Sequence, residues 1–302
     1  MSTQPAVAQE QSPAQVEPVP FGPGDRMWDE MGDAFAVSLW GAAFMLQAMH
    51  PTISAAVDHH SVFRTDPLGR AVRSADSVML WVYGGAEAIV EGRRLRELHK
   101  PIRGRDRDGT PYSALNPEAY AWVHGTSFVT TVATYPLIHG REMTEAEQVD
   151  YYREVLQLGD ILQIPRRLMP PDPAAYWDYY HEMVATRLAR SIVAEDLLRS
   201  FAAPDFSILP GPLDRLAWPG KRALGHFLYL STIGGMTPDA REVLGVRWTS
   251  LHDAQLRAFA AAARPVHRRL PEPLRYLPIA LHARRRARSI DAIKQRSSTS
   301  LV

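Results

Sequence analysis

The chain has 302 residues, 46% of them hydrophobic and 22% charged, so it can bury a sizeable core and is not a wholly disordered protein. It contains no cysteine, which excludes a disulfide scaffold, a thiolate-bound metal or haem, and a cysteine nucleophile. Any metal would need His, Asp, Glu, Met or Tyr ligands, and 11 histidines are present.

The net charge of +1 conceals a basic C-terminal region. From Arg264 onward, ten Lys and Arg residues stand against two Asp and Glu, a local charge of +8 that leaves −7 for the rest. The run Arg284-Arg285-Arg286-Ala287-Arg288 could contact nucleic acid or an anionic membrane. Because the run is short and lacks interleaved aromatic residues, we interpret it as a solvated helix end and expect no nucleic-acid partner.

The first 22 residues are rich in Gln, Ser, Pro and Ala, and they have neither a basic nor an apolar segment typical of a secretory signal. We expect a disordered leader over residues 1–22, one helical domain over 23–290 and a flexible basic tail over 291–302.

Two uncharged stretches could be mistaken for membrane spans. Residues 34–49 are too short, and residues 119–140 contain Pro136, two histidines and several hydroxyl side chains. We expect both to be buried helices and the protein to be cytoplasmic, without a transmembrane segment.

Helix signals dominate the rest of the chain. Asn116-Pro117, Thr144 with Glu147, and Asp172-Pro173 are typical helix starts. A polar loop is expected over 104–112, and no alternating β-branched run predicts a sheet. The sequence therefore predicts an all-α fold, a single domain of about ten helices. In chain order the expected helices cover 27–49, 52–60, 74–100 with Ser74 as N-cap, a helix from 117, 144–162, 172–201, 220–230, 238–244, 250–270 and 279–290.

Common catalytic motifs are missing from the sequence. The Gly pairs at 84–85 and 234–235 lack the further Gly or Lys of a phosphate-binding loop, and no Gly-x-Ser-x-Gly elbow occurs. Neither the His-Glu-x-x-His zinc pair nor the Glu-x-x-His pairs of a di-iron bundle are present.

A cluster of His and Arg residues between positions 50 and 104 is the remaining candidate for chemistry. This mixture suits haem b, which needs an imidazole on iron, an apolar slot for the ring and cations for two propionates. His99 falls on the last turn of its helix, with Leu95 one turn earlier. The cluster comprises His50, His59, His60, Arg64, Arg70, Arg73 and His99, and the slot would be formed by Phe63, Val78, Trp81, Val82 and Leu95. A single His is more often a surface or core residue than a ligand, and the arginines could equally bridge helix ends.

Several short motifs along the chain are informative in combination. They are Leu46-Gln47-Ala48-Met49-His50-Pro51, His60-Ser61-Val62-Phe63-Arg64, Asp66-Pro67-Leu68-Gly69-Arg70-Ala71-Val72-Arg73-Ser74, Val82-Tyr83-Gly84, Leu98-His99-Lys100-Pro101-Ile102-Arg103-Gly104, Tyr112-Ser113-Ala114, Trp122-Val123-His124, Tyr151-Tyr152-Arg153-Glu154, Leu168-Met169-Pro170 and Arg241-Glu242-Val243-Leu244-Gly245. Each motif is weak alone, but their order and spacing over about residues 25–285 are specific. Together they resemble the rubber-oxygenase catalytic-domain family, which includes the latex-clearing proteins and the MpaB-type oxygenases.

The resemblance implies an all-α fold with a globin-like helical core and haem b held by one proximal histidine. By motif, this iron ligand falls on His99, with His124 as the second choice. The family segment near the haem falls on Arg70, Arg73 and Ser74. Latex-clearing proteins have a lysine where Arg73 stands, and a guanidinium is a poor iron ligand, so a lysine-bound iron is not expected here.

We therefore expect a haem b-dependent oxygenase or oxidoreductase that uses dioxygen or peroxide on a small, hydrophobic or biosynthetic intermediate, as in secondary metabolism. Arg70 and Arg73 would anchor propionates or stabilise negative charge, and His60 or His50 would donate a proton. Arg64, Ser74, Trp81, Leu95 and His124 complete the expected cofactor contacts.

Two other functions stay open at this point. The same pocket could hold haem or another hydrophobic ligand without turnover, as in a carrier. A non-haem metal enzyme using His50, His60 and Asp58 is disfavoured by their spacing. The sequence is compatible with a homodimer and does not identify the substrate.

Overall fold

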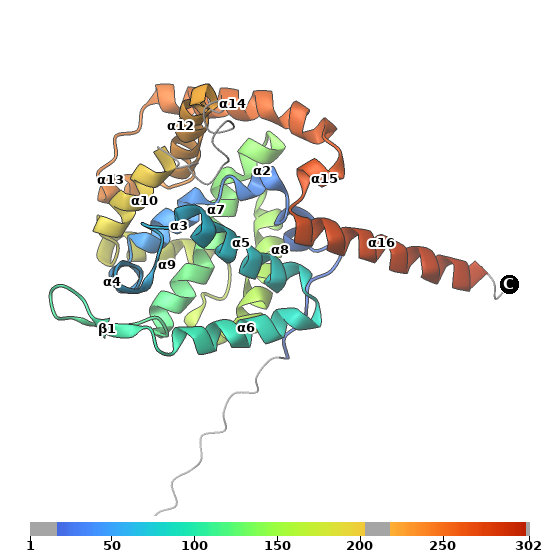
Figure 1. Cartoon of the computed structure of the whole chain (residues 1–302), viewed down its shortest axis with the longest axis horizontal. Helices are drawn as coiled ribbons and strands as arrows, with labels where there is room; N and C mark the ends of the chain where they lie inside the picture. The colour runs from blue at the N-terminus through green and yellow to red at the C-terminus, as the bar shows by residue number, and fades with distance from the viewer. Residues whose placement is uncertain (1–16, 203–217, 300–302) are drawn as a thin grey trace, which may run out of the picture.

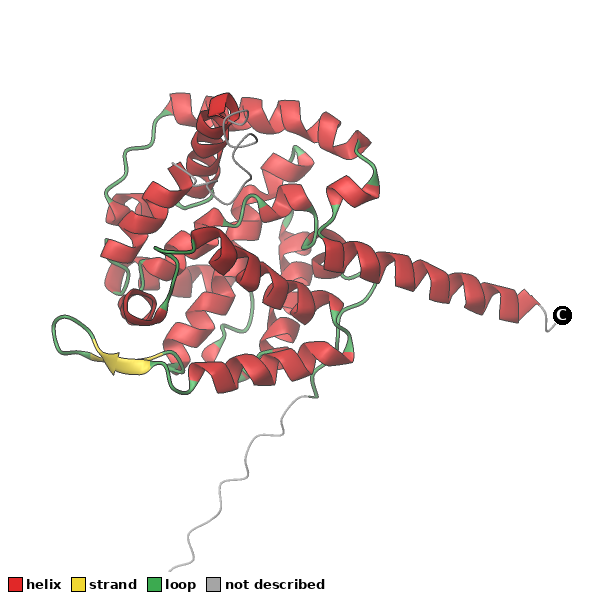
Figure 2. Cartoon of the chain, in the orientation of Figure 1, coloured by secondary structure: helices red, strands yellow, loops and turns green. Residues whose placement is uncertain are grey.

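The computed structural model describes residues 17–202 and 218–299, and helices make up most of these ranges (Figures 1 and 2). The prediction of an all-α fold is confirmed. The helices of the first half are α1 (Arg26–Glu30), α2 (Ala34–Val37), α3 (Gly41–Ala48), α4 (Pro51–His60), α5 (Pro67–Tyr83), α6 (Ala86–His99) and α7 (Pro117–His139). Those of the second half are α8 (Glu145–Ile161), the 3-10 turn η1 (Arg166–Leu168), α9 (Pro173–Thr186), α10 (Ile192–Ala202), α12 (Trp218–Gly234), α13 (Pro238–Leu244), α14 (Ser250–Arg269), α15 (Glu272–Arg275) and α16 (Pro278–Thr299).

Helix α7 forms the centre of the molecule and packs against α3, α8 and α14 (Figure 1). Its uncharged sequence is explained by burial, since Trp122, Phe128 and Tyr135 are each at most 2% exposed. The Trp122 indole donates a hydrogen bond to the carbonyl oxygen of Leu46 on α3. As expected from sequence, Asn116 caps this helix by accepting a hydrogen bond from the backbone N–H of Ala119.

The predicted helix over 74–100 is wrong in its extent, because two helices replace it. Helix α5 begins eight residues earlier than Ser74 implied, with the Asp66 carboxylate accepting a hydrogen bond from the Gly69 N–H. It ends at Gly84, and Gly85 takes a positive φ of 59° that reverses the chain into α6. Helices α5 and α6 therefore form an antiparallel hairpin, and Ser74 lies inside a helix rather than at its cap.

The predicted helix over 172–201 is also divided. Helix α9 ends at Thr186, and the following segment is held by a backbone bond from Ala189 N–H to the Met49 carbonyl. The Ser191 hydroxyl then accepts from the Ala194 N–H at the start of α10. No Gly or Pro marks this break, so a tertiary contact with the end of α3 determines it.

The expected polar loop over 104–112 is instead a small β-hairpin, and the prediction of no sheet is wrong at this place. Strand β1 (Arg103–Arg105) pairs antiparallel with β2 (Pro111–Ser113). Tyr112 of β2 is 7% exposed, and its hydroxyl contacts His59 at 2.8 Å and His60 at 3.1 Å on α4. The strands were missed because they are only three residues long and depend on this docking.

Helix α16 packs its first turns on α5 and then projects away from the body (Figure 1). Helix α16 continues to Thr299, past residue 290, where we expected the helical domain to end. At the other end, Phe21 is buried and the Val19 carbonyl accepts a hydrogen bond from Gln157, while residues 1–16 of the predicted leader lie outside the described residues. Among the described residues, none of the helices has both the length and the hydropathy needed to cross a bilayer.

Candidate functional site

The α5–α6 hairpin brings Arg70 and His99 close together. Both lie about equally far from the turn at Gly84-Gly85, so the antiparallel arrangement sets them side by side. Burial lowers the pKa of His99, and the positive charge of Arg70 lowers it further. The imidazole of His99 is therefore neutral at pH 7, which is the form that binds iron.

His99 has an unused ring nitrogen. Its Nδ1 is buried and has no hydrogen-bond partner in the described residues. The ring of Tyr120, on the first turn of α7, stands edge-on to it with centroids 6.0 Å apart and an interplanar angle of 83°. The Tyr120 hydroxyl and the Trp81 indole nitrogen are also buried without a partner in the described parts of the chain. Because such groups cost free energy, they indicate a place for a ligand or water.

The candidate site is defined here as Arg70, Ser74 and Trp81 of α5, His99 of α6, and Tyr120 of α7. The three α5 residues follow one another at intervals of four and seven, which places them along one helix face. Leu95, one turn before His99, packs partly buried against the main core. Tyr120 was not among the residues predicted from the sequence. It lies beside His99 because α7 crosses α6 at this point.

A buried carboxylate fixes the alignment of the two helices. Glu91 on α6 is 6% exposed and accepts a hydrogen bond from Ser77 of α5 at 2.8 Å. It also receives two bonds from Arg94, which hold the pKa of Glu91 below its usual range. This link lies midway along the hairpin, so it supports the approach of Arg70 to His99.

The three predicted arginines have different surroundings. Arg64 pairs with Asp58 at 2.8 Å and Asp196 at 2.5 Å. Arg73 pairs with Asp66 at 3.0 Å.

Arg70 instead donates to the hydroxyl of Ser74 and has no carboxylate partner in the described residues. Arg70 is therefore the one of the three whose charge is available to a bound anion.

His50 and His60, the two expected proton donors, are not placed beside His99 by any contact within the described residues. His50 precedes α4 and is 3% exposed, with both ring nitrogens unpartnered in the described residues and Nε2 3.6 Å from Glu118. Burial lowers the pKa of His50, and Glu118 partly offsets this effect. His60 is exposed and bonded to Tyr112. The structure thus brings Arg70 to His99, whereas His50 lies near Glu118 and His60 contacts Tyr112.

His124 is a hydrogen-bonded core residue. Its Nε2–H donates to the carbonyl oxygen of Val155 on α8 at 2.6 Å. Burial lowers its pKa to about 4. The Nε2 of His124 is thus already used, whereas the buried Nδ1 of His99 has no hydrogen-bond partner in the described residues.

The low pKa of His124 predicts a loss of stability in acid. Between pH 6.5 and 4 the unfolded imidazole binds a proton and the folded one does not, so stability falls as the pH is lowered. From pH 7 to pH 5 this residue should cost about 2 kcal/mol. Urea unfolding of wild type and His124→Gln at both pH values measures the effect. The variant should lose less stability than wild type on acidification. An equal loss in both proteins would contradict the lowered pKa of His124.

The donor set suits haem b better than a free metal ion. In the described ranges, no three His, Asp or Glu side chains converge as ligands for an ion. A porphyrin supplies four nitrogen ligands itself, so one histidine suffices. A neutral imidazole beside an arginine without a carboxylate partner in the described residues matches that need. The indole of Trp81 lies farther along the same face of α5, about 16 Å from Arg70 along the helix axis.

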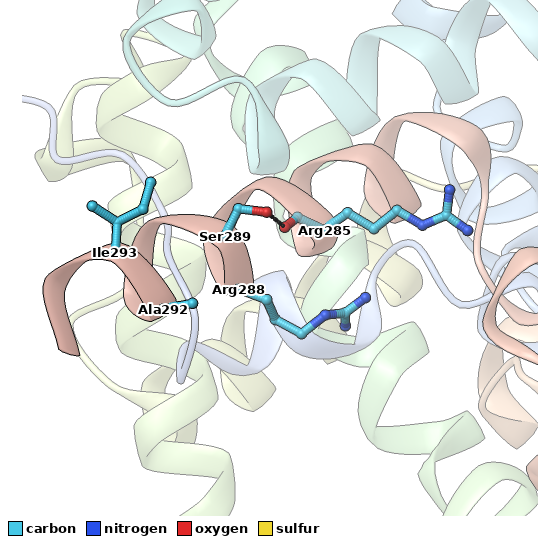
Figure 3. A pocket seen from close by; sticks show the side chains of 5 residues that line it. All are labelled: Arg285, Arg288, Ser289, Ala292 and Ile293. Carbon is cyan, nitrogen blue, oxygen red and sulfur yellow. Dashed lines mark hydrogen bonds between the residues drawn. The ribbon is translucent and has the colours of Figure 1, made fainter. Parts of the chain in front are cut away.

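A separate concave volume shares no residue with the candidate site. Figure 3 shows that all its lining side chains come from one helix, α16. Arg288 there pairs with Glu272 at 2.7 Å, and the Ser289 hydroxyl donates to the Arg285 carbonyl. It is a surface concavity beside the projecting helix.

Comparisons with known proteins identify two relatives and a family. The chain is similar to Uncharacterized protein Mb2261 of Mycobacterium bovis and Uncharacterized protein Rv2237 of Mycobacterium tuberculosis, at 23% identity over 173 residues in each case. This alignment covers 57% of the chain and 64% of each relative, so the match spans less than two thirds of their length. No solved structure matches. Residues 28–265 match the family model described as ER-bound oxygenase mpaB/B'/Rubber oxygenase, catalytic domain. The chain therefore belongs to this oxygenase family.

Proposed function

We propose that the protein is a haem b-dependent oxygenase in which His99 is the iron ligand. The observation that carries the proposal is the approach of Arg70, across the α5–α6 hairpin, to a neutral imidazole whose buried Nδ1 has no hydrogen-bond partner in the described residues. Membership of an oxygenase family supports the reaction class. The substrate would be a small hydrophobic or biosynthetic intermediate, oxidised with dioxygen or peroxide.

The other residues of the candidate site have roles consistent with this cofactor. Arg70 has no carboxylate partner in the described residues and would pair with a propionate, and Ser74 orients it through their hydrogen bond. Trp81 and Leu95 are half-buried and would contact the apolar ring. Tyr120 holds the imidazole edge-on and limits its rotation.

Bound haem b would supply the electron-transfer and oxygen chemistry that amino-acid side chains lack. The chain provides the surroundings. Neutral His99 offers a lone pair at pH 7, because its lowered pKa keeps it unprotonated. The half-buried Tyr120 ring would shield one side of His99 from bulk water, and the Arg70 charge would favour anionic groups near it.

The absorption spectrum of the purified full chain tests the proposal. Expression with a haem precursor should give a Soret band, and the pyridine haemochrome should show about one haem b per chain. Absence of both would contradict it. Oxygen consumption that depends on an added apolar substrate would distinguish an oxygenase from a carrier, which would show the Soret band without turnover.

A further inference from the structure

A second concave site lies at the other end of α7. It has a cavity volume of about 280 Å³ and is bounded by α1, α2, α7, α14, α15 and α16. Ile138 lines it, whereas Tyr120 of the candidate site lies on the first turn of the same helix. At ~1.5 Å rise per residue, these two positions are about 27 Å apart, so the two sites are separate.

The carboxylates of this cavity already have partners. The two oxygens of Asp33 accept from the Phe35 N–H and from His267 at 2.8 Å. Glu30 lies 3.2 Å from Arg26 and 3.4 Å from His139.

Asp29 lies 3.6 Å from Arg284. The acidic side chains are therefore committed to protein cations and leave little acceptor capacity for others.

The cavity has more guanidinium N–H donors than its carboxylates can accept hydrogen bonds from. Arg268 is exposed and has no carboxylate partner within residues 17–202 and 218–299. Arg264 donates to the Pro136 carbonyl and has no carboxylate partner in these ranges.

Arg275 lies 3.8 Å from Asp33 and Arg284 lies 3.6 Å from Asp29, but the Nε atoms of both arginines are buried and lack hydrogen-bond partners in the same ranges. These N–H groups require acceptors, and an anionic oxygen is the strongest acceptor for a guanidinium.

The remaining wall of the cavity is apolar and rigid. Phe35, Ile138 and Tyr276 line it and are each partly buried. The guanidinium of Arg284 lies 4.4 Å from the centre of the Tyr276 ring and that of Arg275 lies 5.3 Å from it, which restrains the ring. A ligand with a flat apolar body would cover this wall while its charged end met the arginines.

We propose that this cavity binds a small organic anion, whose carboxylate or phosphate group is held by Arg268 with Arg275 and Arg284, and whose apolar body lies on Phe35 and Tyr276. The excess of unpartnered N–H donors beside an aromatic wall fits that chemistry. The site is independent of haem and of the oxygenase reaction.

Calorimetric titration of the purified full chain with benzoate, at ionic strength fixed with sodium chloride, tests the proposal. Benzoate should bind at one saturable site. Arg268→Gln should weaken it about tenfold, because a charge-assisted hydrogen bond is lost. Arg269→Gln is the matched control, since Arg269 is the next residue on α14, is exposed and does not line the cavity.

Equal weakening by both variants, or no saturable heat with benzoate, would overturn the site. Inorganic phosphate is titrated in parallel as an anion without an apolar body. It should bind more weakly than benzoate, and tighter binding of phosphate would overturn the role of the aromatic wall. Because Arg268 is exposed, its replacement should leave the melting temperature nearly unchanged, which separates loss of binding from loss of fold.

Discussion

Replacement of His99 by alanine is expected to abolish haem b binding while the chain stays folded. The imidazole would provide the single bond from protein to iron, so its loss should remove the Soret band almost completely. The fold should survive, because the buried Nδ1 of His99 has no hydrogen bond to any described residue that the variant would break. Soret absorbance per chain and the pyridine haemochrome measure the loss, and circular dichroism confirms the helical fold.

A glycine variant provides a sharper form of the same test. His99→Gly leaves space for free imidazole, and added imidazole should restore the Soret band if position 99 is the ligand position. His60→Gln is the matched control, because His60 is exposed and its contact is with Tyr112. It should keep full haem occupancy. Full occupancy in His99→Ala would contradict the assignment and transfer the ligand role to His124.

The helical class was predictable because its signals are local. The pattern Thr144 with Glu147 predicted a capping box, and the structure has both of its reciprocal hydrogen bonds at the start of α8. Asn116 and Asp172 likewise cap the helices that their sequences predicted. Side-chain caps act within four residues, so a single sequence reveals them.

The breaks within long helices depend on contacts that sequence does not reveal. The end of α9 is set by a backbone bond from Ala189 to Met49, some 140 residues earlier. The β-hairpin depends on Tyr112 reaching α4. The Gly84-Gly85 pair, in contrast, is a visible sequence signal for a helix break. The positive φ of Gly85 could have been expected from this pair.

The same distinction applies to the candidate site. The sequence marks Arg64, Arg70 and Arg73 as a group, but only tertiary structure separates them. Arg64 is paired with Asp196, which is 132 residues away. Arg70 keeps its charge unpaired by a carboxylate in the described residues, and Tyr120 joins the site through helix crossing. Sequence therefore identifies candidate residues, and packing decides which of them remain available.

Replacement of Phe128 by alanine is expected to destabilise the fold by about 3–5 kcal/mol. Phe128 is fully buried in the middle of α7, with ring centroids 5.0 Å from Tyr152 on α8 and 5.1 Å from Tyr176 on α9. Both contacts are near-perpendicular, and large rings cannot easily move to fill the space. The free energy of unfolding, measured with urea at pH 7.5, tests this value.

Val123→Ala is the control on the same helix, because Val123 is 38% exposed and its change should alter stability by less than about 1 kcal/mol. A loss below about 1 kcal/mol in Phe128→Ala would contradict the packing of α7 between α8 and α9, since a removed buried ring must leave a cavity. The position of Tyr120 beside His99 depends on the same helix. A destabilised α7 should therefore also lower haem retention in Phe128→Ala, and Val123→Ala should retain it fully.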